Sequence, residues 1–179
     1  MYKNKAMRGP GRYLAPLLLL AAPAMAENFD PASLDLAALI ECRADVPAYN
    51  GFALWLSGAP GAVGKLGWKE VATGNPFLVQ YELPVPLRVF GREAGSVVFT
   101  ATAPMAVFDG IAAPDLAKEL KVTPTISTPG KFLGEKVVAE STEDAGGVSL
   151  ATRITLNVST VESHPGKTLA GCSYALDVK

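Results

Sequence analysis

The stretch "KTLAGCSYALDV", residues 167–178, alternates two kinds of side chain and decides how the chain folds. Apolar side chains occupy every second position of its latter part: Cys172, Tyr174, Leu176 and Val178. Because successive side chains of a β-strand point to opposite faces, this pattern predicts a strand that buries one face. Cys172 lies on that face, so we expect its sulfur to point into the core.

The other cysteine of the chain, Cys42, lies near the end of a segment with helical spacing. This segment, "DPASLDLAALIECRADV" (residues 30–46), carries apolar side chains that recur on one face of a helix: Leu36, Leu39 and Ile40. The spacing predicts one helix with Asp30 or Ser33 as its N-cap. Cys42 falls on the flank of the apolar face, at or near the core.

The first 26 residues have the pattern of a secretory signal peptide. Four basic residues and no acidic one precede or flank the apolar run "YLAPLLLLAA", and "AMA" stands before Glu27. An apolar run of about ten residues is roughly half of what a membrane-spanning helix needs. We expect residues 1–26 to be removed and residues 27–179 to reside in a bacterial periplasm, with no membrane insertion after cleavage.

An oxidising compartment favours a bond between the two cysteines. We expect a disulfide between Cys42 and Cys172, which contributes about 4 to 5 kcal/mol in the chain-entropy model. A free buried pair is one alternative. The other is a catalytic thiol activated by His164, the only histidine; the eight residues from His164 to Cys172 span about 26 Å in a strand, beyond hydrogen-bond reach.

The charge balance excludes several kinds of partner. The chain has 16 Lys and Arg residues, and four of them lie in the leader, which leaves 12 against 17 acidic residues. A net-acidic chain without basic runs does not bind nucleic acid or an anionic membrane surface, because both need clustered Lys and Arg. Residues 27–179 suffice for one domain.

The remaining pattern predicts short helices and antiparallel strands. Helices are expected at residues 47–58 and 113–121, strands at 75–91, 96–108, 131–141, 148–160 and 167–178, a rigid linker at 122–130, and a turn at 142–147. In the first strand Phe77, Val79, Tyr81, Leu83, Val85, Leu87 and Val89 are expected on one face. Pro84 and Pro86 belong at an edge or a bend, because proline cannot donate to a sheet.

These elements predict an α+β fold with an antiparallel sheet covered by two or three short helices. The segments "LGWKEVA" (66–72) and "LGEKVVA" (133–139) agree at five of seven positions, and each follows a "DLA" helix. A second reading is therefore open, with two tandem related helix-on-sheet modules at residues 27–112 and 113–179.

Motifs for known chemistries are incomplete. "GAPGAVGK" (58–65) lacks the spacing, the Ser or Thr and the preceding strand of a phosphate loop. One histidine and two bonded thiols cannot form a tetrahedral zinc site, and the acids Glu140, Glu143 and Asp144 match no calcium loop. Ser163 beside His164 is adjacency in sequence and not a triad. We expect no metal and no cofactor.

Two classes of function stay open: binding, and hydrolysis, for which the sequence carries no complete motif. We expect a non-enzymatic binding module that takes a protein partner or a small apolar ligand in the cell envelope, through a sheet face or a groove near four aromatic residues: Tyr49, Trp55, Trp68 and Tyr81. The alternatives are a hydrolase that uses a carboxylate pair or His164 with Glu162, and a carrier of an apolar ligand.

Overall fold

The computed structural model of the chain describes residues 29–178. The signal peptide predicted for residues 1–26 lies outside the described residues. Within residues 29–178, no helix combines the length and the apolar character needed to cross a membrane.

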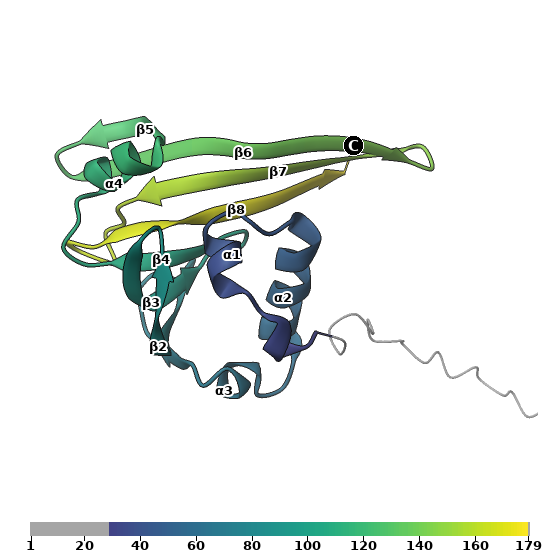
Figure 1. Ribbon diagram of the computed structural model, residues 1–179, viewed down its shortest axis with the longest axis horizontal. Coiled ribbons are helices and arrows are strands. Elements are labelled where there is room, and N and C mark those ends of the chain that lie inside the picture. Colours follow the sequence, from purple (N-terminus) through teal and green to yellow (C-terminus); the bar gives the residue numbers. More distant parts are fainter. Residues whose placement is uncertain (1–28, 179) are drawn as a thin grey trace, which may run out of the picture.

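Short helices and eight strands make up the fold of residues 29–178 (Figure 1). The helices are the 3-10 turn η1 (Pro31–Ser33), α1 (Leu36–Ile40), α2 (Val46–Gly58), α3 (Ala62–Lys65) and α4 (Ala113–Leu120). The strands are β1 (Lys69–Val71), β2 (Val79–Val89), β3 (Arg92–Phe99), β4 (Pro104–Phe108), β5 (Thr123–Thr128), β6 (Lys131–Ala145), β7 (Val148–Ser159) and β8 (Thr168–Val178).

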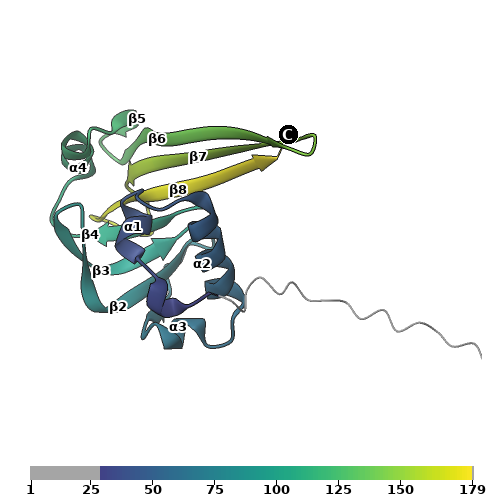
Figure 2. The same ribbon diagram turned by 45° about the vertical axis from the view of Figure 1, so that its right-hand side comes forward.

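The strands form one sheet in the order β1-β2-β3-β4-β8-β7-β6-β5, and every neighbouring pair is antiparallel. Helices α1 and α2 lie against one face of this sheet, while β6 and β7 extend well past them (Figures 1 and 2). The predicted α+β class with an antiparallel sheet is therefore confirmed.

The helix predicted for residues 30–46 is interrupted. Asp30 caps η1 by accepting a hydrogen bond from Ala32 N–H at 2.9 Å, and Asp35 caps α1 by accepting one from Ala38 N–H at 2.8 Å. Two capping carboxylates five residues apart each satisfy a separate helix start, so the chain bends between them. Helix α1 ends before Cys42, which has a left-handed backbone (φ 59°).

The predicted disulfide between Cys42 and Cys172 is confirmed. The two Cα atoms are 5.3 Å apart, and the bond joins the residues that follow α1 to the middle of β8. Cys172 is fully buried, as the alternation of β8 required. Such a bond is compatible with an oxidising compartment.

The strand predicted at residues 75–91 is shorter and bent. Strand β2 begins at Val79, and its pairing with β3 shifts between Glu82 and Leu87, where the two prolines lie. Both faces of β2 are exposed from Pro84 to Pro86, so Val85 is 72% exposed, and Phe77 lies outside the strand and is 83% exposed. The expectation that both face the core was wrong.

Two segments predicted as loops belong to strands. Residues 123–128 form the edge strand β5, in which Pro124 is tolerated because it lies at a register shift on the outermost strand. The acidic segment 142–145 continues β6, and the turn is confined to Gly146 and Gly147, whose positive φ angles (62° and 86°) fit a two-residue hairpin loop.

The short sequence repeat does not match equivalent strands. Strands β1 to β4 are neighbours in chain order, β5 to β8 likewise, and the two groups meet at β4 and β8. "LGWKEVA" (66–72) contains β1, the first strand of its group, whereas "LGEKVVA" (133–139) lies in β6, the second of its group. The two tandem modules at residues 27–112 and 113–179 stay a prediction. The similarity of the two seven-residue segments does not support it.

Candidate functional site

The four aromatic residues singled out in the sequence lie together between α2 and the first half of the sheet. Helix α2 turns Tyr49 and Trp55 towards the strands, and each is only 3% exposed. Tyr81 of β2 is also buried, and Trp68, just before β1, is half-buried.

Two of the four serve mainly to pack this region. The ring of Trp68 lies 5.4 Å from that of Tyr81 and 6.1 Å from that of Phe99, measured between ring centroids. Trp55 packs against Phe29 at 5.2 Å. Aromatic pairs at these distances stabilise a core beyond the area they bury. Trp55 and Trp68 therefore pack the region around the site, whereas Tyr49 and Tyr81 are the two of the four that line a groove.

A groove of about 340 Å³ opens above Tyr49 and Tyr81, between α2 and the segment that leads into β2. Leu56 of α2 lines one wall, and Phe77 and Val79 line the other. None of the groove-lining residues carries a charge. An apolar, uncharged hollow of this size fits one large side chain or a short stretch of hydrocarbon.

Side-chain hydrogen bonds hold Phe77 in its exposed position. The N–H of Phe77 donates to Oδ1 of Asn75 at 3.0 Å, and the N–H of Asn75 donates to Oγ1 of Thr73 at 3.1 Å. Asn and Thr side chains commonly fix tight turns in this way. The loop therefore presents an aromatic ring to solvent at the rim of the groove.

The tyrosine hydroxyls of the groove stay uncharged. Burial raises the pKa of Tyr49 to about 12, and its hydroxyl donates to the carbonyl oxygen of Ala101 at 3.4 Å. Burial, and then the nearby negative charge of Glu70, raises the pKa of Tyr81. The groove has no ionised group below strongly alkaline pH, which favours an apolar occupant.

His164 lies in a different place, in the loop between β7 and β8. It is buried, and both of its ring nitrogens have neutral partners: Nε2 donates to Oε1 of Gln80 at 2.9 Å, and Nδ1 lies 3.0 Å from Oγ of Ser163. The amide nitrogen of Gln80 in turn donates to Ser96 Oγ at 3.3 Å, which supports this orientation of the amide. Burial, and then the charge of Lys167, lowers the pKa of His164. The imidazole thus ties its loop to β2.

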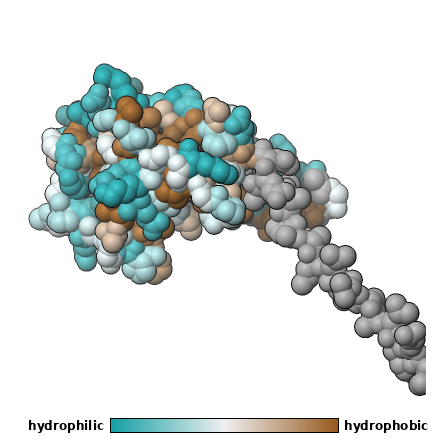
Figure 3. Space-filling view, turned by 90° about the horizontal axis from the view of Figure 1, so that it is seen from below, coloured by the Kyte–Doolittle hydropathy of each residue, from teal (hydrophilic) through white to brown (hydrophobic). Residues whose placement is uncertain are grey.

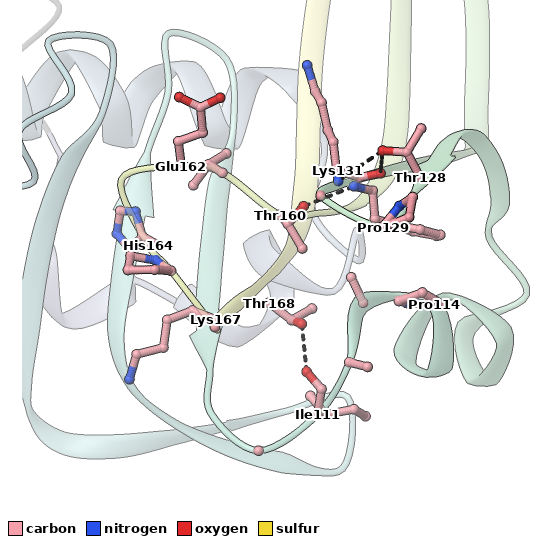
Figure 4. A pocket seen from close by; sticks show the side chains of 18 residues that line it. Ile111, Pro114, Thr128, Pro129, Lys131, Thr160, Glu162, His164, Lys167 and Thr168 are labelled. Carbon is pink, nitrogen blue, oxygen red and sulfur yellow. Dashed lines mark hydrogen bonds between the residues drawn. The ribbon is translucent and has the colours of Figure 1, made fainter.

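The pairing of His164 with Glu162 that the hydrolase alternative requires is not formed. Figure 4 shows the two side chains at the wall of an open cavity of about 710 Å³, pointing in different directions. Glu162 is the only acidic residue among those lining this cavity, so the cavity lacks the second carboxylate that two-acid hydrolysis needs. Lys167 is paired with Asp109, and Thr168 donates to the carbonyl oxygen of Ile111 at 2.7 Å.

Residues 29–178 contain neither a free thiol nor a cluster of side chains arranged to bind a metal ion. Both cysteines are joined in the disulfide, so neither can act as a nucleophile. No group of three or more His, Cys, Asp or Glu side chains in the described part of the chain is arranged to hold a metal ion.

Sequence reasoning missed Phe77 and Gln80. Phe77 was assigned to a buried strand face, although Asn75 and Pro76 before it are the residues that typically form a turn. Gln80 has no local signal, because its partner His164 is 84 positions away in the chain.

In comparisons with known proteins, no family model, no curated protein and no solved structure matches the chain.

Proposed function

We propose that this protein is an exported, non-enzymatic binding module of the bacterial periplasm, and that the groove beside Tyr49 and Tyr81 takes an apolar group of its ligand or partner protein. The observation that carries the proposal is the uncharged lining of this groove, with Phe77 held at its rim. Covering a solvent-exposed phenylalanine with a partner lowers the free energy of the complex, because apolar surface is removed from water.

The state of the reactive groups favours binding over catalysis. His164 has neutral partners at both nitrogens, and the cysteines are bonded to each other. In a Ser-His-Asp triad a carboxylate orients the histidine and stabilises its charged form, whereas Nε2 of His164 is bound by the neutral amide of Gln80; a nucleophilic cysteine needs a free thiolate. These groups stabilise the fold instead, and the cavity beside His164 and Glu162 has no second carboxylate among its lining residues.

Export is part of the proposal. The leader pattern of residues 1–26 and the Cys42–Cys172 bond agree with an oxidising location outside the cytoplasm.

The experiment is a titration with the uncharged apolar dye N-phenyl-1-naphthylamine. Dye in the groove gains emission and quenches the tryptophans by energy transfer, because the ring of Trp68 lies 5.4 Å from that of Tyr81, which lines the groove. The groove variant is Phe77→Ser with Val79→Ser, two side chains exposed to solvent. The control is Val85→Ser, which lies on the same strand as Val79, is 72% exposed and lies outside the groove.

We expect one dye per chain, at least tenfold weaker binding to the groove variant and unchanged binding to the control. A protein that binds no dye, or a groove variant that binds as the unaltered chain does, overturns the proposal. Native mass spectrometry of the purified protein then separates a carrier, which retains an apolar molecule, from a module that engages a partner protein.

A further inference from the structure

We propose a second binding surface, independent of the groove: the far end of the β6-β7-β8 face docks a segment of a partner protein that carries both apolar and basic side chains. Two rows of directly opposed residues define this tip face, namely Ser141, Thr152 and Leu176 in one row and Glu143, Leu150 and Val178 in the other.

The tip face continues the core beyond the helices that cover it. Cys172 and Tyr174 of β8 lie on this same face and are buried under α1 and α2. Leu176 and Val178 continue the alternation, yet they are 47% and 67% exposed. Figure 1 shows the reason: β6, β7 and the end of β8 run past α2. Apolar side chains on the core side of a sheet are stabilised when something covers them.

A cavity of about 510 Å³ lies between the tip face and the first turn of α2. Leu150, Ile154 and Leu176 supply its apolar floor, and Val46 and Pro47 of α2 form the opposite wall. The tip face is therefore the floor of a groove, and the first turn of α2 is its wall. Such a groove can orient an inserted segment, which a flat patch cannot do.

The charge around this groove is of one sign. The residues that line it include three acidic ones, Asp45, Glu140 and Glu143, and no basic residue. Glu140 is already paired with Arg153 at 3.0 Å, whereas Asp45 and Glu143 form no ion pair within residues 29–178. An apolar floor with an anionic rim is complementary to Leu, Val or Ile flanked by Lys or Arg, whose hydrocarbon stems also cover apolar surface.

The same charge argues against other occupants. A second copy of this chain would bring its own Asp45 and Glu143 against these carboxylates, and like charges in one interface repel. An anionic lipid surface is repelled for the same reason. Apolar residues also reach solvent on the face seen in Figure 3, where they are interspersed with hydrophilic ones, as is usual for a protein surface.

The experiment measures binding of the whole exported protein to three labelled peptides of equal length, with repeating Leu-Lys, Leu-Glu and Ser-Lys, by fluorescence anisotropy at low and high salt. The apolar variant is Leu176→Ser with Val178→Ser, and its control is Val137→Ser, an exposed valine on β6 outside this cavity. The charge variant is Asp45→Asn with Glu143→Gln; asparagine keeps the oxygen that caps α2 at Ala48 N–H.

We expect the Leu-Lys peptide to bind at least tenfold more tightly than the other two. The apolar variant should lose at least tenfold in affinity, the charge variant should bind more weakly with a smaller salt dependence, and Val137→Ser should bind unchanged. Equal binding of all three peptides, or an apolar variant that binds as the unaltered protein does, overturns the proposal. The proposal is also overturned if the unaltered protein forms a dimer, or binds anionic vesicles, and the apolar variant does not. Because Phe77 and Val79 are untouched, the dye titration of the first groove is decided separately.

Discussion

The hydroxyl of Tyr174 donates a 2.7 Å hydrogen bond to the carbonyl oxygen of Leu39, a residue 135 positions earlier in the chain. Leu39 lies in the last turn of α1, where carbonyl groups have no partner inside the helix. The ring of Tyr174 also stacks on Tyr49 of α2, with centroids 4.9 Å apart. Two residues before Tyr174, Cys172 is bonded to Cys42. Strand β8 is thus fastened to both α1 and α2 on one face.

Replacing both cysteines tests the disulfide and the backbone of Cys42 together. The variant Cys42→Ala with Cys172→Ala should lose about 4 to 5 kcal/mol in the free energy of unfolding, because the bond closes a long loop. Cys42 has φ 59°, a conformation that costs a non-glycine residue about 1 kcal/mol or more. Cys42→Gly with Cys172→Ala should therefore be about 1 kcal/mol more stable than the alanine pair. Urea unfolding compares the three proteins, and equal stability of the two variants contradicts the role given to φ.

The two stacked tyrosines make the fold sensitive to alkali. Burial raises the pKa of Tyr49 to about 12, and burial, followed by the charge of Asp45, raises that of Tyr174 above its usual value. A raised pKa contributes stability that is complete below pH 10, the pKa of an unfolded tyrosine, and is lost as the pH rises through the folded pKa. Each tyrosine should lower the free energy of unfolding by up to about 1.4 kcal/mol per pH unit above pH 10.

Urea unfolding at pH 9, 10 and 11 measures this slope. Tyr49→Phe should reduce the slope, because phenylalanine does not ionise in either state. A slope that is the same in the unaltered protein and in Tyr49→Phe would show that this hydroxyl does not titrate differently on folding.

Gly171 lies where β8 meets β4, and there a side chain cannot fit. A Cβ atom at this position would lie 2.1 Å from the carbonyl oxygen of Pro104 and 2.6 Å from Cα of Met105, both backbone atoms that cannot move aside. Gly171→Ala should therefore cost at least about 3 kcal/mol or prevent folding. The matched control is Gly95→Ala in β3, where nothing lies within 4 Å of the added Cβ and stability should change by less than about 1 kcal/mol. Thermal unfolding and yield distinguish the two.

The pKa of His164 should lie below the usual value for histidine, because the folded environment disfavours the charged ring. Its pKa is lowered from 6.5 by burial and then by Lys167, so the neutral ring stabilises the fold above pH 6.5, and this contribution is lost as the pH falls through the lowered pKa. Since it is the only histidine, its NMR signals can be followed without ambiguity. A midpoint at or above 6.5 contradicts the structure, and the midpoint should be the same in Val85→Ser, which leaves this loop untouched.

The strand alternation and the cysteine count were enough to predict the central features of the fold. Cys172 was expected inward and bonded to Cys42, and helices α2 and α4 were expected close to their observed bounds. These features depend on local spacing and on the presence of only two thiols. The edge strand β5 was missed because Pro124 within it and Pro129 just after it typically mark a linker, and an edge strand needs hydrogen bonds on one side only.

What the sequence by itself determined is therefore the class of the fold, the disulfide and the lack of a recognisable catalytic motif, because each depends on residue type and short-range periodicity. Only the tertiary structure decided which aromatic side chains reach a surface, that His164 is bound to Gln80, and that Leu176 and Val178 extend past α2. These relations join residues far apart in the chain and depend on where a helix stops covering a sheet, a length that no local pattern specifies.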